Sequence, residues 1–163
     1  MTIQTEVRKA GPYVGNGVTT TWPFAFKVFS TSELQVYVRT TVGGSDVLQA
    51  EGITYFVAMN PDQDASPGGT VTYPIGATPV LGDTGALVIL SAVPNTQPVD
   101  LPSGGRFFSE VVETAFDRCV VLIQQLVERL TRTLQLPAST PADVSTELPL
   151  PAALHFLRWD ADG

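Results

Sequence analysis

The first hundred residues alternate hydrophobic and polar positions in short runs. In residues 21–28, and again in residues 34–38, every second side chain is large and apolar. A period of two is typical of strands that bury one face. These apolar positions are Trp22, Phe24, Phe26 and Val28 in the first run, and Leu34, Val36 and Val38 in the second. Because Pro23 cannot donate a hydrogen bond to a neighbouring strand, we expect the first strand to lie at a sheet edge or to begin late.

Further strands are expected at residues 53–59, 68–73 and 86–93. The run ITYFVAM alternates, GGTVTY opens on two glycines, and ALVILSAV is almost continuously apolar, as expected of a strand buried on both faces. Gly43 and Gly44 predict a hairpin turn before the short run 46–50. Strands that recur about every 8 to 15 residues between turn residues indicate a mainly β fold, with an antiparallel β-sandwich over residues 1–102.

Residues 103–136 are predicted to hold a linker and one long amphipathic helix. In the stretch SGGRFFSEVVETAFDRCVVLIQQLVERLTRTLQLP, Ser109 is a candidate N-cap, Glu110 lies in the first turn and Pro137 ends the helix. Large apolar side chains recur at alternating spacings of three and four residues, which is a heptad seam. The seam consists of Val112, Phe116, Cys119, Ile123, Leu126 and Leu130, and Val120, Val127 and Leu134 widen it.

The seam fits two arrangements. A helix that caps the open face of its own sheet shows an apolar stripe of this kind. A helix that packs against copies of itself shows it too, and the seam is wider than a two-stranded coil buries, so it fits three helices. The periodicity does not choose between the two.

After Pro137 the sequence becomes rich in proline. Residues 137–163 are predicted to form an extended connector that leads to a shaft or a neighbouring molecule. The connector closes on the run HFLRWDADG. Its aromatic residues are expected either to dock on a neighbour or to precede further chain.

Composition and single residues narrow the chemistry. The formal net charge of −7, with Lys and Arg scattered singly, argues against a nucleic-acid partner. No apolar run reaches the roughly 18 to 20 residues of a membrane span. His155 is the sole histidine and lies in the connector, so catalysis or metal binding would depend on it alone. Cys119 is expected to be a buried small hydrophobe. We therefore expect no enzyme, no metal site and no cofactor.

Four blocks in order carry a resemblance to a known family. They are GNGVTTTWPFAFKVFSTSELQVYV, GITYFVAMNPDQDASPGGTVTY, GALVILSAVPNTQPVDL and GGRFFSEVVETAFDRCVVLIQQLVERLTRTLQLP. Over residues 10–137 the chain resembles the N-terminal virion-anchoring domain of bacteriophage tail fibres and tailspikes, above all those of short-tailed phages. The strongest local match lies on the helix and comprises Phe108, Glu110, Glu113, Ala115, Phe116, Asp117, Arg118, Gln124 and Gln125.

The resemblance implies a structural role in the virion. Such domains form homotrimers, assemble in the host cytoplasm and grip an adaptor or nozzle protein of the tail, while receptor-binding or glycan-cleaving domains lie farther along the fibre. We expect the seam to be the trimer interface. As candidate tail-docking elements we take the N-terminal arm, residues 1–12, and the loops around Tyr13, Gly43, Gly44, Pro61, Asp62 and Gly68.

Three alternatives stay open at this point. The chain could be a complete small adaptor that holds a separate receptor-binding fibre. It could be a glycan-binding sandwich in which Trp22, Tyr37 and Tyr55 stack on sugars. It could also be the mount of a polysaccharide depolymerase whose active site lies in a longer chain.

Overall fold

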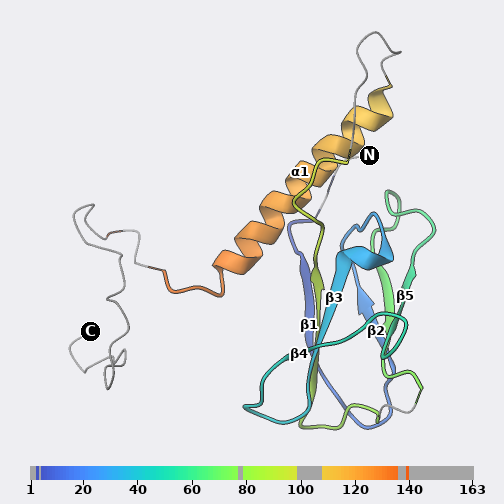
Figure 1. The fold of residues 1–163 in the computed structure, drawn as a ribbon, viewed down its shortest axis with the longest axis vertical. Coiled ribbons are helices and arrows are strands. Elements are labelled where there is room, and N and C mark those ends of the chain that lie inside the picture. The colour runs from blue at the N-terminus through green and yellow to red at the C-terminus, as the bar shows by residue number, and fades with distance from the viewer. Residues whose placement is uncertain (1–2, 4, 77–78, 99–107, 136–138, 140–163) are drawn as a thin grey trace. The chain divides into compact units, whose positions relative to one another are not determined.

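A computed structural model describes residues 3, 5–76, 79–98, 108–135 and 139. Within these residues the chain forms seven β-strands, one short 3-10 helix and one long α-helix (Figure 1). In chain order they are β1 (Lys9–Val14), β2 (Thr21–Phe24), η1 (Thr31–Glu33), β3 (Leu34–Arg39), β4 (Val47–Leu48), β5 (Phe56–Met59), β6 (Gly69–Thr72), β7 (Ala86–Ser91) and α1 (Ser109–Leu130).

The strands form two antiparallel sheets. One sheet has the order β1-β7-β3-β4 and the other has the order β2-β6-β5. Strand β2, which contains Pro23, is an edge strand, as expected. The mainly β, antiparallel fold with one long helix is therefore confirmed. The predicted extended connector lies outside the described residues, apart from Ser139, and the predicted domain boundaries stay predictions.

The core lies between the two sheets and follows the predicted alternation. Val36 and Ile89 are opposite each other in β3 and β7, and both are fully buried. Phe26 and Val28 are buried as well, although β2 already ends at Phe24. Burial of each such side chain contributes about 1.5–3 kcal/mol, so this shared face is the main source of stability.

The sequence pattern does not predict strand β1, and its presence corrects the expectation that residues 1–12 form a docking arm. Its sequence, KAGPYV, shows no apolar alternation. It pairs with β7 nevertheless, with an irregularity in register between Ala10 and Tyr13. Arg8, just before the strand, is 2% exposed. Residues 8–12 are thus part of the sandwich and are not a free docking arm.

Strand β7 is not buried on both faces, contrary to expectation. Leu87 and Ile89 point into the core, whereas Val88 and Leu90 are only partly buried on the outer face of the sheet. The reason is that α1 is attached at the end of the sandwich and leaves this outer face uncovered. It contacts the sandwich at Ser91, where β7 ends, and at Arg8, just before β1 begins.

Helix α1 spans 22 residues and is shorter than the predicted run. Phe108 occupies the N-cap position without a side-chain hydrogen bond, so Ser109 is the first helical residue and not the cap. The helix ends at Leu130, where Thr131 begins a turn, well before Pro137. Among the described residues no helix has the length and hydrophobicity needed to cross a membrane.

Candidate functional site

Helix α1 turns a largely polar row of side chains toward the sandwich. Asp117, Val121 and Gln125 follow one another at intervals of four residues and are 5%, 0% and 5% exposed. Residues four apart on an α-helix lie on the same face. These three residues therefore mark the side on which the helix is attached, and we call their contacts with the sandwich the polar junction.

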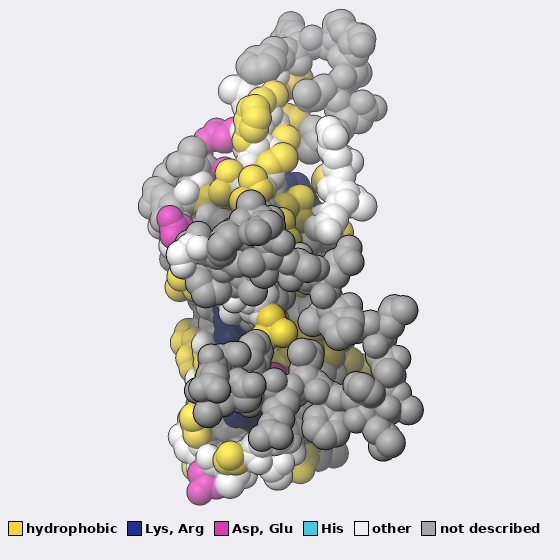
Figure 2. All heavy atoms as spheres, turned by 90° about the vertical axis from the view of Figure 1, so that its left-hand side faces the viewer, with side chains coloured by type: hydrophobic (Ala, Val, Ile, Leu, Met, Phe, Trp, Pro, Cys, Tyr) yellow, Lys and Arg dark blue, Asp and Glu magenta, His cyan; other side chains and the backbone are white. Residues whose placement is uncertain are grey.

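The apolar seam lies on the opposite side of the helix. Each residue advances the helix by about 100°, which places the centre of the seam about half a turn from Val121. Figure 2 shows hydrophobic side chains gathered over the helix. The exposed fractions are 67% for Phe116, 62% for Ile123, 57% for Leu126 and 47% for Leu130. Val112 is partly exposed, and Cys119 is exposed and not buried as expected.

Two ion pairs hold the N-terminal half of the helix to the sandwich. Lys27 Nζ lies 2.8 Å from Asp117 Oδ2 and 2.5 Å from Asp64 Oδ1, and Arg118 Nη2 lies 2.6 Å from Glu33 Oε1. Burial opposes the charge of Lys27, but hydrogen bonds to Asp117 and Asp64 outweigh it, so the pKa of Lys27 is raised. The hydrogen bond from Lys27 lowers the pKa of Asp64, which is exposed.

Gln125 fastens the helix to the chain that leaves β7. Its Oε1 accepts hydrogen bonds from Ser91 Oγ and from the Val93 amide, both at 2.7 Å, and its Nε2 donates to the Val93 carbonyl at 3.2 Å. The side-chain amide thus pairs with Val93 as a neighbouring strand would. Next to it, Gln124 Oε1 accepts from Arg8 Nε at 2.6 Å, and Gln124 Nε2 donates to the Thr5 carbonyl at 3.0 Å.

Chemically, the polar junction fixes an orientation. Buried ion pairs add little net stability because desolvation offsets their attraction, yet separating one partner leaves a buried charge. In the structure these contacts hold the helix with its seam turned outward. Sequence reasoning did not assign the junction. Asp117, Arg118, Gln124 and Gln125 nevertheless stood among the helix positions of the family resemblance, and that was the available signal.

The candidate docking residues are not equivalent in the structure. Gly43, Gly44, Pro61 and Asp62 are exposed in loops. Tyr13 lies in strand β1, partly buried, and its hydroxyl donates to the Pro23 carbonyl. Gly68 is buried, with a φ of 104°. Tyr13 and Gly68 are therefore not exposed loop residues, and the docking role of the other four stays a prediction.

The proposed sugar-stacking residues do not form an exposed platform. Trp22 and Tyr55 are 4% and 3% exposed and belong to the core, and Trp22 Nε1 donates to the Tyr73 carbonyl. Tyr37 alone of the three is partly exposed. The glycan-binding hypothesis based on these rings is therefore wrong. Across the described part of the chain no cluster of His, Cys, Asp or Glu is suited to hold a metal ion, and His155 lies outside it.

Comparison with known proteins finds a sequence similarity over most of the chain. No family model matches the sequence. Over 138 residues the chain is 35% identical to the tail spike protein of Salmonella phage epsilon15. The match covers 85% of this chain but only 12% of that protein, so the chain spans about an eighth of its relative's length. The predicted resemblance to phage tail spike and tail fibre proteins is confirmed by this similarity over most of the chain.

Proposed function

We propose that this chain is a structural, non-enzymatic component of a phage tail: a homotrimeric anchor that attaches a receptor-binding fibre or tailspike to the tail. The similarity to a tail spike protein supports the structural role in the tail. The observation that carries the trimeric anchor is the exposed seam, because the helix is fixed to its own sandwich through its other face.

The size of the seam supports association of whole chains. Four of its side chains are 47–67% exposed, so burying the remainder contributes roughly 1–2 kcal/mol for each of them. In three copies this amounts to about 12–24 kcal/mol, comparable with the roughly 4–15 kcal/mol that each association step costs in lost freedom. Val120 and Val127, 40% and 54% exposed, widen the apolar face beyond what two helices bury, which favours three.

Two hollows beside the seam offer space for a neighbour's side chains. One of about 460 Å³ is lined by Val112, Phe116 and Cys119, and one of about 280 Å³ is lined by Ile123 and Leu126. Both are bounded by Leu122 and by Asn95, in the segment that follows β7. Their lining is mainly apolar. Side chains of a second and third copy of the seam would fill them.

The proposed anchor divides its surfaces between two tasks. The seam joins three chains, while the loops of the sandwich remain free to contact an adaptor or nozzle protein of the tail. Among the predicted docking residues, Gly43, Gly44, Pro61 and Asp62 are exposed for such a contact. Receptor recognition, and any enzymatic activity, would then belong to domains joined to this anchor.

The mass of the chain in solution tests this proposal. Native mass spectrometry of residues 1–163 should give a trimer, and the variant Ile123→Asp with Leu126→Asp should give a folded monomer. The matched control is Val18→Asp with Ile53→Asp, which also replaces two exposed apolar residues by carboxylates, away from the helix. The control should remain trimeric. A monomeric wild type, or equal loss of mass in the control, would contradict the seam as the interface.

A further inference from the structure

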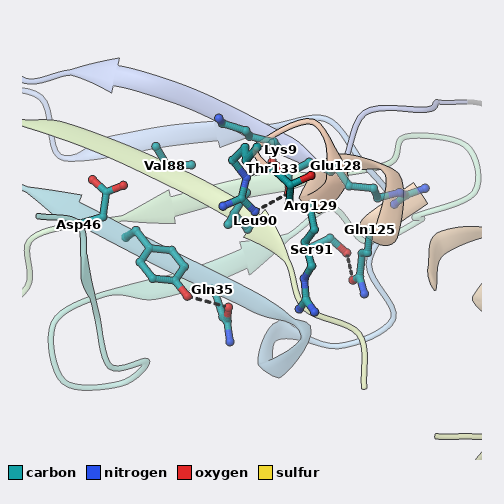
Figure 3. Close-up of a pocket in the computed structure, with 13 residues that line it drawn as sticks. Lys9, Gln35, Asp46, Val88, Leu90, Ser91, Gln125, Glu128, Arg129 and Thr133 are labelled. Carbon is teal, nitrogen blue, oxygen red and sulfur yellow. Dashed lines mark hydrogen bonds and ion pairs between the residues drawn. The ribbon is translucent and has the colours of Figure 1, made fainter. Parts of the chain in front are cut away.

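A second surface lies between the outer face of the four-stranded sheet and the last turns of α1 (Figure 3). It encloses about 570 Å³. Its floor is made by Tyr37 of β3 and by Val88 and Leu90 of β7, the partly buried residues of the outer face. Its rim carries charged side chains from β1, from the loop before β4 and from the helix. We call this surface the cationic groove.

The charges around the groove are unusual for this chain. Of the nine Lys and Arg residues in a sequence of net charge −7, four line this one groove. The basic residues are Arg8, Lys9, Arg129 and Arg132, and the acidic ones are Asp46 and Glu128. Arg8 is buried, so the open part of the rim carries three positive and two negative side chains, a local excess of one positive charge.

Internal pairing satisfies only part of this charge. Arg132 makes two hydrogen bonds to Glu128, at 3.0 and 2.8 Å. No ion pair engages Lys9 or Arg129 within the part of the chain that the structure describes. Arg8 differs from these two, because it is 2% exposed and its guanidinium donates to Gln124 and to the Lys27 carbonyl, so it adds charge beside the groove without being open to a ligand. The groove therefore holds basic groups that a negatively charged ligand would satisfy.

We propose that the cationic groove binds an acidic, extended peptide segment of a partner protein, whose carboxylates pair with Lys9 and Arg129 and whose apolar side chains rest on Val88 and Leu90. This goes beyond the anchor function and does not depend on trimerisation. The groove is lined by Gln125, Glu128 and Arg132, on the side of the helix opposite the seam. Arg129 and Gln125 also border the smaller hollow beside the seam, whereas Lys9, Val88 and Leu90 do not, so most of the groove stays open when the seams pack together.

The shape and charge of the groove favour a peptide over other anions. Its volume lies in the range of pockets that enclose drug-sized ligands and greatly exceeds the space that a single phosphate ion needs. Its floor is apolar and its basic residues come from two separate elements, which suits a segment that alternates acidic and apolar side chains. The chain's overall charge of −7 disfavours a long polyanion such as nucleic acid.

Titration with defined peptides tests this inference. The probe is an acetylated and amidated six-residue peptide of alternating Glu and Leu, and its counterpart replaces each Glu by Lys. Binding would be followed in ¹⁵N NMR spectra of residues 1–163 at low salt. We expect the Glu peptide to shift the amide signals of Val88, Leu90 and Arg129, with binding that weakens as salt is added, and the Lys peptide to shift none of them.

Substitutions in the rim should move the affinity in opposite directions. Lys9→Gln with Arg129→Gln should weaken binding roughly tenfold, since two partly exposed charge pairs are lost. Asp46→Asn should strengthen it about twofold to fivefold, because a competing carboxylate is removed. All three side chains are at least partly exposed, so the variants should fold as the wild type does, which the amide spectrum itself reports.

Three results would overturn the inference: no binding of the Glu peptide at millimolar concentration, unchanged affinity in the rim variants, or displacement of the peptide by an equal concentration of inorganic phosphate. The last result would indicate a small-anion site. Repeating the titration on an Ile123→Ser, Leu126→Ser variant, which removes two seam side chains without placing a carboxylate beside Arg129, separates this inference from the trimer proposal. The groove should bind the peptide equally well in that variant.

Discussion

Replacing Gln125 by Ala should detach the helix from the end of β7. The side chain is 5% exposed and makes three hydrogen bonds, to Ser91 and to both backbone groups of Val93. The substitution removes all three and leaves the Ser91 hydroxyl and the Val93 amide and carbonyl without their partner. It therefore tests the polar junction at the residue with the most contacts.

The loss can be worked out from these contacts. Three hydrogen bonds at about 0.5–1.5 kcal/mol each give roughly 1.5–4.5 kcal/mol, and polar groups that stay buried and unpaired add to the cost. Water that enters the space left by the side chain would recover part of it. We expect the free energy of unfolding to fall by about 2–4 kcal/mol.

Two measurements should be made on the Ile123→Asp, Leu126→Asp background, so that association does not contribute to stability. Urea denaturation followed by circular dichroism gives the free energy of unfolding. Hydrogen exchange at the Val93 amide, which donates to Gln125, reports the junction directly. Exchange there should become roughly 10- to 100-fold faster if helix docking weakens by about 1.4–2.8 kcal/mol.

Two further variants sharpen the result. Gln49→Ala removes a glutamine whose side chain makes one local hydrogen bond, to the Val47 carbonyl, and should cost less than about 0.5 kcal/mol. Gln125→Glu keeps the size and the acceptors but cannot donate to Val93 at neutral pH, so it should lose nearly as much stability as Gln125→Ala. If Gln125→Ala costs no more than Gln49→Ala and Val93 exchange is unchanged, the junction does not hold the helix as described.

The remaining predictions concern the Lys27–Asp117 ion pair and two glycines. Lys27→Met should lower the free energy of unfolding by about 3–5 kcal/mol because it leaves Asp117 buried without its partner. The double variant Lys27→Met, Asp117→Leu should recover most of that loss in urea denaturation. An equal loss of stability in the two variants would refute the coupling. The pKa of Lys27 in the folded state is raised above 10.5. The stability that the charged Lys27 contributes is therefore present below pH 10.5 and is lost as the pH rises through the folded-state pKa. Wild type and Lys27→Met should converge in stability only above about pH 10.5. Gly68→Ala should destabilise the fold by about 2 kcal/mol or more, because Gly68 has a φ of 104° and a Cβ there would collide with the Phe24 carbonyl. Gly43→Ala should cost about 1 kcal/mol of stability, because Gly43 has a φ of 75° but lies in open space. Thermal melts that show equal shifts for the two variants would contradict this difference.

Much of the sandwich could be predicted because its strands carry their own signal. Alternation in β3 gives its buried face directly, and the apolar run of β7 marks a central strand. Strand β1 has no such signal, since Gly11 and Pro12 interrupt it, and it is a strand only because β7 offers it an edge. Its position follows from pairing over a long sequence distance, which a local pattern does not contain.

Sequence periodicity could not predict the orientation of the helix, because that orientation also depends on contacts between distant parts of the chain. The rule that an apolar stripe faces its own core would turn the seam inward. In the structure the polar side docks instead, through partners 32 to 119 residues away, such as Val93 for Gln125, Glu33 for Arg118 and Thr5 for Gln124. The periodicity predicts an apolar stripe on the helix, but only these distant contacts show that the stripe faces outward.

The central claim is that the seams of three helices pack together, and oxidation of Cys119 tests it most directly. Cys119 is the sole cysteine and is exposed on the seam. In a packed seam its copies would lie within the roughly 4–7 Å between Cα atoms that a disulfide requires. Mild oxidation of dilute protein should therefore join two of the three chains of each trimer, giving dimer and monomer bands on a denaturing gel.

The control moves the thiol to the other side of the helix. In Cys119→Ser with Thr114→Cys the new thiol is exposed near the polar junction side, far from any sister helix in the proposed trimer. This variant should stay monomeric on the denaturing gel after the same oxidation, while native mass spectrometry still gives a trimer. Cross-linking of Cys119 and none at position 114 is the predicted result; no cross-linking at Cys119, or equal cross-linking at both positions, would contradict packing through the seam.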